Sequence, residues 1–196
     1  MEVFRKDCGW IEVVCGPMFS GKTEELIRRL RRALYAKQCV EIYKPRLDTR
    51  FAKIEIVSHS QQSLHAVPIG DAAEILDKSA PEVDVVGIDE AQFFEANLVD
   101  VAQVLANRGV RVIAAGLDQD FRGIPFEPMP ALMAVAESVT KALAICMVCG
   151  NPAGRSQRLA RTGKRVVLGA TEAYEARCRQ CHDLRAPLPG QEEMFG

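Results

Sequence analysis

The stretch that decides the fold of this chain is Gly16-Pro17-Met18-Phe19-Ser20-Gly21-Lys22-Thr23. It has the form G-x-x-x-x-G-K-T and stands between an apolar run at 11–15 and a helical pattern, which is typical of a phosphate-binding loop, or P-loop. Its two glycines let the backbone curl, so that consecutive N–H groups and the N-terminus of the helix face one hollow. The sequence therefore predicts that this stretch binds the phosphates of a nucleotide.

Two side chains of the P-loop carry specific predictions. Lys22 is expected to reach the β and γ oxygens of the nucleotide, and the Thr23 hydroxyl is expected to bind Mg²⁺. A second motif follows the apolar run at 83–88, which predicts a buried strand ending at Asp89 and Glu90. An aspartate at the end of such a strand is typical of a Walker B motif, whose carboxylate holds Mg²⁺ directly or through water. Together the two motifs indicate a Mg²⁺-dependent nucleotide site.

Strand-like and helical patterns alternate along the chain. Apolar runs typical of strands stand at 11–15, 39–43, 83–88, 110–115 and 139–145, and helical patterns at 22–37, 71–79, 95–107 and 128–135. This alternation predicts an α/β fold with a mainly parallel, RecA-like P-loop sheet, right-handed crossovers and helices on both faces. Because ligands bind at the carboxyl edge of such a sheet, we expect the loop at 116–123 to join the two motifs around one cleft.

The helix predicted at 22–37 has an apolar face and a run of arginines. The apolar face comprises Leu26, Ile27, Leu30, Ala33 and Leu34. Glutamates stand at helical spacing from the arginines, which predicts Glu24–Arg28 and Glu25–Arg29 ion pairs. We therefore interpret the arginine run as a solvated face and not as a nucleic-acid site.

The segment at 46–67 has weak periodicity. Loops of this size inside compact domains are usually functional, so we expect a long excursion near the active site with a short strand at 54–57. His59 and His65 lie in it without a second group at the spacing of a site. They are interpreted as polar packing residues.

Composition limits the classes of function. The chain has 196 residues, 48% of them hydrophobic, and a net charge of −1, which predicts one α/β domain with a small appendage. A nearly neutral chain has no global field that would recruit nucleic acid or an anionic membrane, and neither partner is expected. The first residues are charged and no apolar stretch approaches the length of a membrane span, so a cytoplasmic location is expected.

The chain has seven cysteines, and four of them form two C-x-x-C pairs, Cys146/Cys149 and Cys178/Cys181. In a reducing compartment this spacing indicates a metal site, with four thiolates arranged tetrahedrally around Zn²⁺. Four protein ligands leave no open coordination position, so the zinc is expected to be structural; His182 is an alternative ligand. The remaining cysteines are interpreted as structural thiols: Cys8, Cys15 and Cys39.

The two cysteine pairs clip a basic segment at its base. Its basic residues are Arg155, Arg158, Arg161, Lys164 and Arg165. A mobile flap over an anionic ligand is one interpretation, and a nucleic-acid-binding ribbon is the other. The flap is favoured because no aromatic stacking platform precedes Tyr174. The expected organisation is a flexible N-terminus at 1–9, a P-loop nucleotide-binding domain at 10–145, a zinc subdomain at 146–182 and a flexible tail at 183–196.

In combination, these motifs resemble the thymidine kinases of the type found in most bacteria and in the animal cytosol. The matching stretches are the P-loop, Asp89-Glu90-Ala91-Gln92-Phe93-Phe94, Gly116-Leu117-Asp118-x-x-Phe121 with Pro125-Phe126, and the paired cysteines, the second pair preceded by Tyr174. The resemblance runs from about Trp10 to Cys181. It is far more specific than a P-loop alone, since ordinary P-loop enzymes lack both the D-E-x-Q-F-F stretch and the terminal zinc clip.

The resemblance implies transfer of a phosphoryl group from ATP to the 5′-hydroxyl of thymidine, giving thymidine monophosphate, with deoxyuridine as a second substrate. It makes Glu90 the general base, with Lys22 also in a catalytic role, and Asp89 a ligand of Mg²⁺. It groups Gln92 with the ATP-binding residues. An acid one residue beyond the metal-binding position can face the acceptor hydroxyl, which fits this assignment chemically. Asp48 and Arg50 resemble a family stretch near the transferring phosphate.

The resemblance also implies an apolar and aromatic nucleoside pocket under a zinc-clipped lasso loop, whose main chain reads the edge of the base. The matching positions are Met18, Phe93, Leu117, Phe121, Phe126, Val167 and Tyr174. At Arg165 the family often has an apolar residue, so this side chain points outward or the rim of the pocket differs. A homotetramer and feedback inhibition by thymidine triphosphate are further expectations from the family.

Two other functions compete with a nucleoside kinase. One is a nucleic-acid-stimulated RecA-like ATPase with a zinc ribbon, in which the acidic pair would activate water. The absence of a second motor domain and the neutral overall charge disfavour it. The other is a zinc-dependent structural adaptor with a vestigial nucleotide site, which conflicts with the intact Lys22, Thr23, Asp89 and Glu90.

Overall fold

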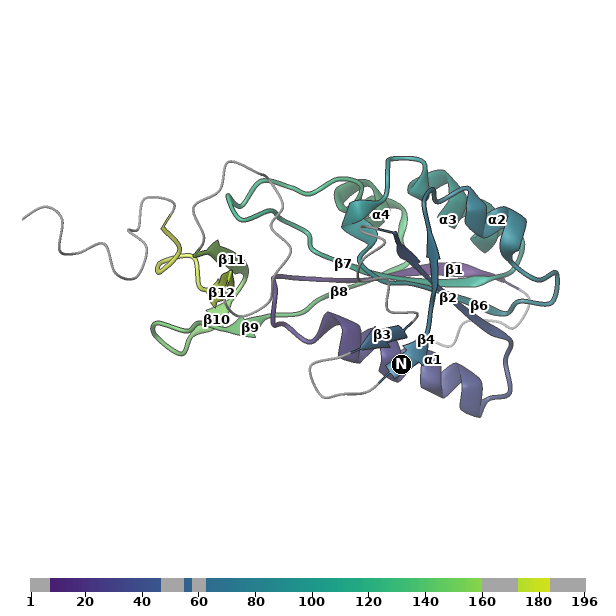
Figure 1. The fold of residues 1–196 in the computed structure, drawn as a ribbon, viewed down its shortest axis with the longest axis horizontal. Helices are drawn as coiled ribbons and strands as arrows, with labels where there is room; N and C mark the ends of the chain where they lie inside the picture. Colours follow the sequence, from purple (N-terminus) through teal and green to yellow (C-terminus); the bar gives the residue numbers. More distant parts are fainter. Residues whose placement is uncertain (1–7, 47–54, 58–62, 160–172, 184–196) are drawn as a thin grey trace, which may run out of the picture.

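The computed structural model describes residues 8–46, 55–57, 63–159 and 173–183. Its centre is a six-stranded sheet with the strand order β5-β2-β6-β7-β1-β8 (Figure 1). The strands are β1 (Trp10–Cys15), β2 (Val40–Pro45), β5 (Val67–Ile69), β6 (Val85–Ile88), β7 (Arg111–Gly116) and β8 (Ser138–Lys141). Every pairing in this sheet is parallel, which confirms the predicted α/β sheet.

Helices cover both faces of the sheet, as predicted. One face carries α1 (Lys22–Tyr35), and the other carries α2 (Glu74–Lys78), α3 (Leu98–Asn107) and α4 (Met129–Val135) (Figure 1). Side chains of a strand alternate between faces, so Val13 of β1 belongs to the core under α3 while Val14 belongs to the core under α1. Burial on both faces explains why the central strands β1, β6 and β7 are apolar nearly throughout. No helix of the described part of the chain is long and apolar enough to cross a membrane.

Helix α1 corrects two details of the sequence interpretation. Its buried face consists of Leu26, Ile27, Leu30 and Ala33. Leu34, which was expected on this face, is 44% exposed. The helix ends at Tyr35, before the predicted Lys37, because Lys37 adopts a left-handed φ of 58° and the N–H of Gln38 bonds back to the carbonyl of Ala33. Helices α2 and α3 likewise begin about three residues later than the patterns at 71–79 and 95–107 suggested.

The arginines of α1 were predicted to form a solvated face, but not all of them are solvated. Arg28 is exposed and pairs with Glu25, but the side chain of Arg29 is only 12% exposed. Arg29 bonds Glu25 and also reaches the buried Glu12 of β1, with its Nη1 2.6 Å from Glu12 Oε2. Arg111 of β7 binds the other oxygen of Glu12 at 2.7 Å. Arg29 therefore ties α1 to the sheet.

Replacing this buried carboxylate is expected to cost stability at neutral pH. Glu12→Gln should lower the free energy of unfolding at pH 7 by about 3 kcal/mol, because two largely buried guanidinium groups lose the charge they share. Burial raises the pKa of Glu12. Hydrogen bonds from Arg111 and Trp10 and the positive charges of Arg111 and Arg29 together lower the pKa by more than burial raises it, so it lies below the ordinary 4.5. Because the pKa of Glu12 is lower in the folded state, its charge stabilises the fold when the pH is above the unfolded-state pKa. This contribution is lost as the pH falls through the folded-state pKa.

Urea unfolding of Glu12→Gln at pH 7 and at pH 3 measures this contribution. The difference between variant and parent should be large at pH 7 and smaller at pH 3. Glu82→Gln, which changes an exposed glutamate, serves as the control and should match the parent at both values. An equal loss at pH 7 and pH 3 would show that the charge of Glu12 is not what stabilises the sheet.

The chain leaves the main sheet after β8, which corrects the single strand predicted at 139–145. Strand β8 ends at Lys141, and β9 (Ala144–Ile145) pairs with β10 (Pro152–Ala153) in a separate sheet. Strand β11 (Arg155–Arg158) pairs with β12 (Tyr174–Arg177). We call residues 144–158 and 173–183 the C-terminal lobe. A third small sheet pairs β3 (Glu55–Val57) with β4 (Ser63–His65), in agreement with the short strand expected at 54–57.

Candidate active site and metal centre

Three loops leave the carboxyl edge of the main sheet side by side. The P-loop follows β1, Asp89 follows β6, and the loop at 117–126 follows β7. Strand β7 lies between β6 and β1, and all three run parallel, so their C-terminal ends are neighbours. The predicted meeting of these segments at one edge of the sheet is confirmed.

The P-loop is a tight turn in which side chains bind the loop's own backbone. At Gly16, where φ is 143°, a Cβ atom would lie 2.2 Å from the carbonyl oxygen of Ala142, so a side chain is excluded by both conformation and space. The Ser20 hydroxyl donates to the carbonyl of Pro17 at 2.8 Å, and the Nζ of Lys22 donates to the same oxygen at 2.7 Å. The side chain of Lys22, the first residue of α1, thus folds back along the P-loop to Pro17.

Lys22 lies among carboxylates from two neighbouring strands. Burial lowers the pKa of Lys22, and the charges of Glu90, Asp89 and Asp118 oppose that shift. The ammonium group of Lys22 can attract phosphate oxygens, and the neighbouring carboxylates can attract a cation that accompanies them. The site therefore has the charge distribution of a phosphoryl-transfer centre.

The acidic pair after β6 combines one buried and one exposed carboxylate. Asp89 is buried, its Oδ1 accepts the N–H of Glu90, and the same oxygen lies 3.5 Å from the Thr23 hydroxyl. Burial and the neighbouring charge of Glu90 raise the pKa of Asp89 well above its ordinary value. Carboxylate and hydroxyl oxygens are ligands that Mg²⁺ prefers, and a cation there would favour the ionised form of Asp89. Glu90 is exposed and has a left-handed φ of 53°, which turns it out of the strand direction.

Gln92 connects Glu90 to the neighbouring loop. Its Nε2 donates to Glu90 Oε2 at 2.6 Å, and its Oε1 accepts the N–H of Leu117 at 2.9 Å. The side chain is buried, and a Cβ on Gly116 would lie only 2.8 Å from Gln92 Oε1. The sequence interpretation placed Gln92 with the ATP-binding residues and did not anticipate its contact with Glu90. Its position two residues after Glu90 was the only available signal.

Several residues of the expected nucleoside pocket lie together. The rings of Phe93 and Phe126 meet edge to face with centroids 5.9 Å apart. The guanidinium of Arg158 lies 4.0 Å from the ring centroid of Phe121 and 6.0 Å from that of Tyr174. Phe93, Phe126, Phe121, Leu117 and Met18 are half-buried, whereas Tyr174 is buried. Half-buried aromatic rings at a sheet edge provide apolar surface that a flat base can cover.

The C-terminal lobe packs directly on the P-loop. The N–H of Met18 donates to the Ser156 hydroxyl of β11 at 3.0 Å. Phe19 packs against the small apolar cluster of the lobe, which comprises Ala144, Cys146, Ala153, Ala176 and Cys178. The Nε2 of His182 lies 2.9 Å from the carbonyl oxygen of Phe121. Ser156 was not predicted, and a serine between basic residues offers no sequence signal for this contact.

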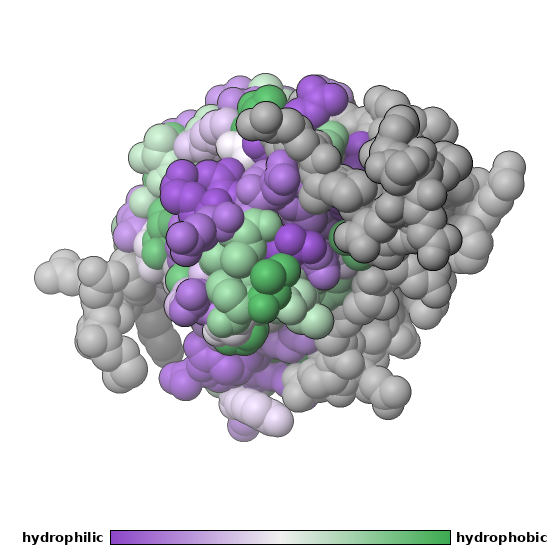
Figure 2. Space-filling view, turned by 90° about the vertical axis from the view of Figure 1, so that its left-hand side faces the viewer, coloured by the Kyte–Doolittle hydropathy of each residue, from purple (hydrophilic) through white to green (hydrophobic). Residues whose placement is uncertain are grey.

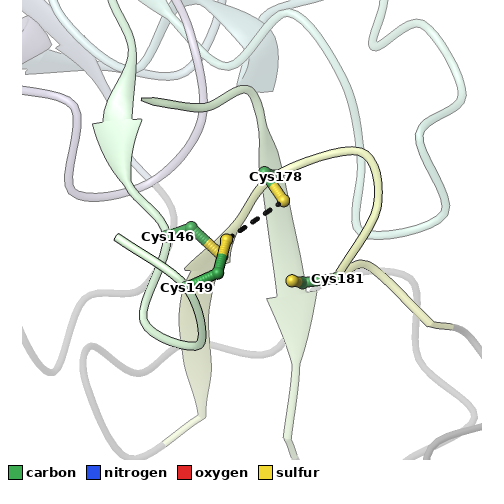
Figure 3. A group of neighbouring side chains, drawn as sticks. All are labelled: Cys146, Cys149, Cys178 and Cys181. Carbon is green, nitrogen blue, oxygen red and sulfur yellow. Dashed lines mark hydrogen bonds between the residues drawn. The ribbon is translucent and has the colours of Figure 1, made fainter. Parts of the chain in front are cut away.

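Four cysteines of the lobe form one cluster at the ends of β9 and β12 (Figure 3). The Sγ atoms of Cys146, Cys149, Cys178 and Cys181 all lie within 4.8 Å of one another, and those of Cys149 and Cys178 are 3.7 Å apart. Zinc–sulfur bonds of about 2.3 Å in a tetrahedron give sulfur–sulfur distances of about 3.8 Å, so the donor set fits Zn²⁺. Backbone N–H groups, that of Cys181 first, lower the pKa of Cys178, which favours the thiolate a metal needs. His182 contacts Phe121 and leaves the four thiols as the ligand set.

The other cysteines differ in their exposure. Cys15 is buried and burial raises the pKa of its thiol, in agreement with a structural role, whereas Cys39 is half-buried and Cys8 is exposed. His65, which was interpreted as a polar packing residue, is exposed on β4.

Some predicted residues fall outside the described part of the chain. They are Asp48, Arg50, His59, Arg161, Lys164, Arg165 and Val167. The predicted tail beyond 183 and most of the predicted N-terminal segment at 1–9 also fall outside it. Their assignments remain predictions.

Known proteins resemble this chain over nearly its whole length. The family model described as "Thymidine kinase" matches residues 9–182. The chain is 58% identical over 190 residues to the thymidine kinase of Rhodothermus sp. (strain ITI 518), an alignment that covers 92% of this chain and 89% of the relative. The family match spans the P-loop, the Asp89-Glu90 pair and both cysteine pairs.

Proposed function

The chain belongs to the thymidine kinase family and is a nucleoside kinase, and from this premise we propose the reaction in detail. It transfers the γ-phosphoryl group of ATP to the 5′-hydroxyl of thymidine, with Mg²⁺, and yields thymidine monophosphate and ADP for salvage of pyrimidine deoxynucleosides. Deoxyuridine is a second substrate. The observation that carries the proposal is the approach of the P-loop to Asp89, with Thr23 Oγ1 3.5 Å from Asp89 Oδ1, and a half-buried aromatic surface at the same edge of the sheet.

The P-loop and Asp89 bind the nucleotide in this proposal. The backbone N–H groups of 16–23 and the amine of Lys22 hold the phosphates, while Thr23 and Asp89 hold the cation. Mg²⁺ neutralises charge on the β- and γ-phosphates when it is bound. The short distance between Thr23 and Asp89 supports this pairing, because one ion can reach both.

Glu90 is the general base. Its carboxylate is exposed toward the site and accepts the proton of the 5′-hydroxyl as that oxygen bonds to the γ-phosphorus and the bond to ADP breaks. Gln92 orients Glu90 through the hydrogen bond between Nε2 and Oε2. In this role Gln92 also links the base to Leu117 of the expected nucleoside pocket.

The nucleoside lies against Met18, Phe93, Leu117, Phe121, Phe126, Val167 and Tyr174. The C-terminal lobe covers it, and the contacts of Ser156 and Phe19 to the P-loop and lobe support such a cover. Asp48 and Arg50 stand on the phosphate side.

One assay separates this function from a nucleic-acid-stimulated ATPase. ADP release is measured with thymidine, with single-stranded DNA and with neither, and thymidine monophosphate is measured in parallel. Stimulation by thymidine alone, with stoichiometric monophosphate, is expected. Stimulation by DNA without a phosphorylated nucleoside would refute the kinase and support a motor protein.

We also propose a cytoplasmic homotetramer that thymidine triphosphate inhibits. Four reduced thiols at a zinc site need a reducing compartment. Exposed apolar side chains favour contact between copies, and those at the lobe end form a hydrophobic group bordered by hydrophilic residues (Figure 2). The exposed apolar side chains of the described residues include Tyr35 on α1 and Ile145, Met147 and Val148 at the lobe. Light scattering should give four times the chain mass, and a monomer would refute this assembly.

Thymidine triphosphate carries the base and sugar of the substrate together with a phosphate chain. It can therefore occupy the nucleoside pocket while its phosphates reach toward the P-loop. Inhibition that thymidine relieves by competition is expected, and inhibition that thymidine leaves unchanged would place the inhibitor at another site.

A further inference from the structure

An ion pair between a buried aspartate and an exposed lysine crosses the base of the P-loop and has no role in the proposed reaction. The Nζ of Lys141 lies 2.6 Å from Oδ2 of Asp118, whose side chain is 5% exposed while that of Lys141 is 46% exposed. Asp118 follows β7 and Lys141 ends β8. Those two strands flank β1 on opposite sides. The pair therefore bridges two strands that are not neighbours, over the end of the strand between them.

The register places this bridge at the first residue of the P-loop. Cys15, the last residue of β1, pairs with Gly116 on one side and with Lys141 on the other. The next residue, Ala142, donates its N–H to the carbonyl of Cys15 at 2.8 Å, and its own carbonyl oxygen fills the space beside Gly16. A displacement of the segment at 141–142 would thus be transmitted to the turn that begins the P-loop.

Asp118 also acts on the P-loop lysine. Only one of its oxygens is bound: within the part of the chain that the structure describes, the buried Oδ1 has no hydrogen-bond partner. A buried carboxylate oxygen without a donor keeps its field in a medium of low dielectric constant. Asp118, like Asp89 and Glu90, raises the pKa of Lys22 and so opposes the lowering that burial causes.

We propose that Asp118 is a positioning residue for ATP, which with Lys141 braces the start of the P-loop. The brace rests on the proposed function only in that the P-loop binds ATP. Asp118 does not touch the reacting atoms in this role. Its loss affects the phosphate site and leaves the nucleoside pocket intact.

The test is direct binding of ATP and of thymidine to the full chain, followed by steady-state kinetics. Asp118→Asn should weaken ATP binding about tenfold or more, in both Kd and KM, because the ion pair that holds the segment at 141–142 against Gly16 is lost. The KM for thymidine should stay within about twofold. Lys141→Gln should also weaken ATP binding, and Lys141→Arg, which keeps the charge, should restore most of it.

Lys78→Gln is the matched control, because Lys78 is 44% exposed and pairs with Glu74 far from the P-loop along the chain. It should bind ATP as the parent does. Unchanged ATP binding in a cooperatively folded Asp118→Asn overturns the proposal, as does an equal rise in the constants of both substrates. If Asp118→Asn does not fold, Lys141→Gln decides the question by the same criteria. A parent chain that binds no ATP refutes the proposed function itself, which is a different outcome.

Discussion

Glu90→Gln is expected to lower kcat by about 10²-fold to 10⁴-fold, the usual contribution of a general base. The amide has nearly the shape of the carboxylate, and its oxygen can still accept the hydrogen bond that Gln92 donates to Glu90 in the parent. It cannot accept the proton of the acceptor hydroxyl. Binding of ATP and thymidine should therefore change little, and the loss should appear in turnover at saturating substrate.

Glu95→Gln is the control for this experiment, because Glu95 is an exposed glutamate just beyond the same motif. It should keep the turnover of the parent. Quench-flow measurement of the chemical step distinguishes slow phosphoryl transfer from slow product release. Near-normal turnover of Glu90→Gln at saturating thymidine would exclude Glu90 as the base.

Cys178→Ser is expected to remove zinc and to unfold the C-terminal lobe. Structural zinc sites in small domains contribute about 10 kcal/mol or more of binding free energy at neutral pH, and that energy is folding energy. The lobe has little else to hold it, since its apolar cluster consists of alanines and cysteines with Phe19 packed against it. The main sheet has its own two cores, so it should remain folded.

Metal analysis and hydrogen exchange measure this result. Zinc content should fall from one ion per chain to a small fraction, and amide protection should be lost in β9 to β12. Protection in the P-loop should also decrease, because Met18 and Phe19 contact the lobe. Cys39→Ser, which changes a half-buried thiol outside the cluster, should keep zinc and protection. Retention of one zinc ion by Cys178→Ser would show that this thiolate is not a required ligand.

The features that could be predicted are those whose chemistry lies in adjacent or regularly spaced residues. A P-loop needs its glycines, lysine and threonine in one turn, and the acidic pair of the Walker B motif stands directly after its strand. The cysteine knuckles are equally local. Apolar runs separated by helical periodicity were enough for a parallel sheet with helices on both faces, because burial on each face imposes a pattern on the chain.

Errors arose where a residue's environment depends on a distant segment. Arg29 was expected in solvent because its neighbours on α1 are charged, yet it binds Glu12 across the helix–sheet interface. Leu34 continued an apolar pattern but is 44% exposed. The run at 139–145 read as one strand, although its two parts pair with different sheets. The spacing of apolar residues indicates which residues share a face of a helix or strand. It does not indicate where along the chain the buried part of that face ends.

The amino-acid order alone was enough to pick out the G-x-x-x-x-G-K-T loop, the acidic pair and the four cysteines that could hold a metal ion, because each is a short-range pattern. Only the tertiary structure decided that Gln92 holds Glu90, that Ser156 reaches Met18, and that Asp118 meets Lys141 over the end of β1. These contacts join residues brought together by strand order. Strand order is set by the free energy of burying whole sheet faces, and no single stretch of sequence records it.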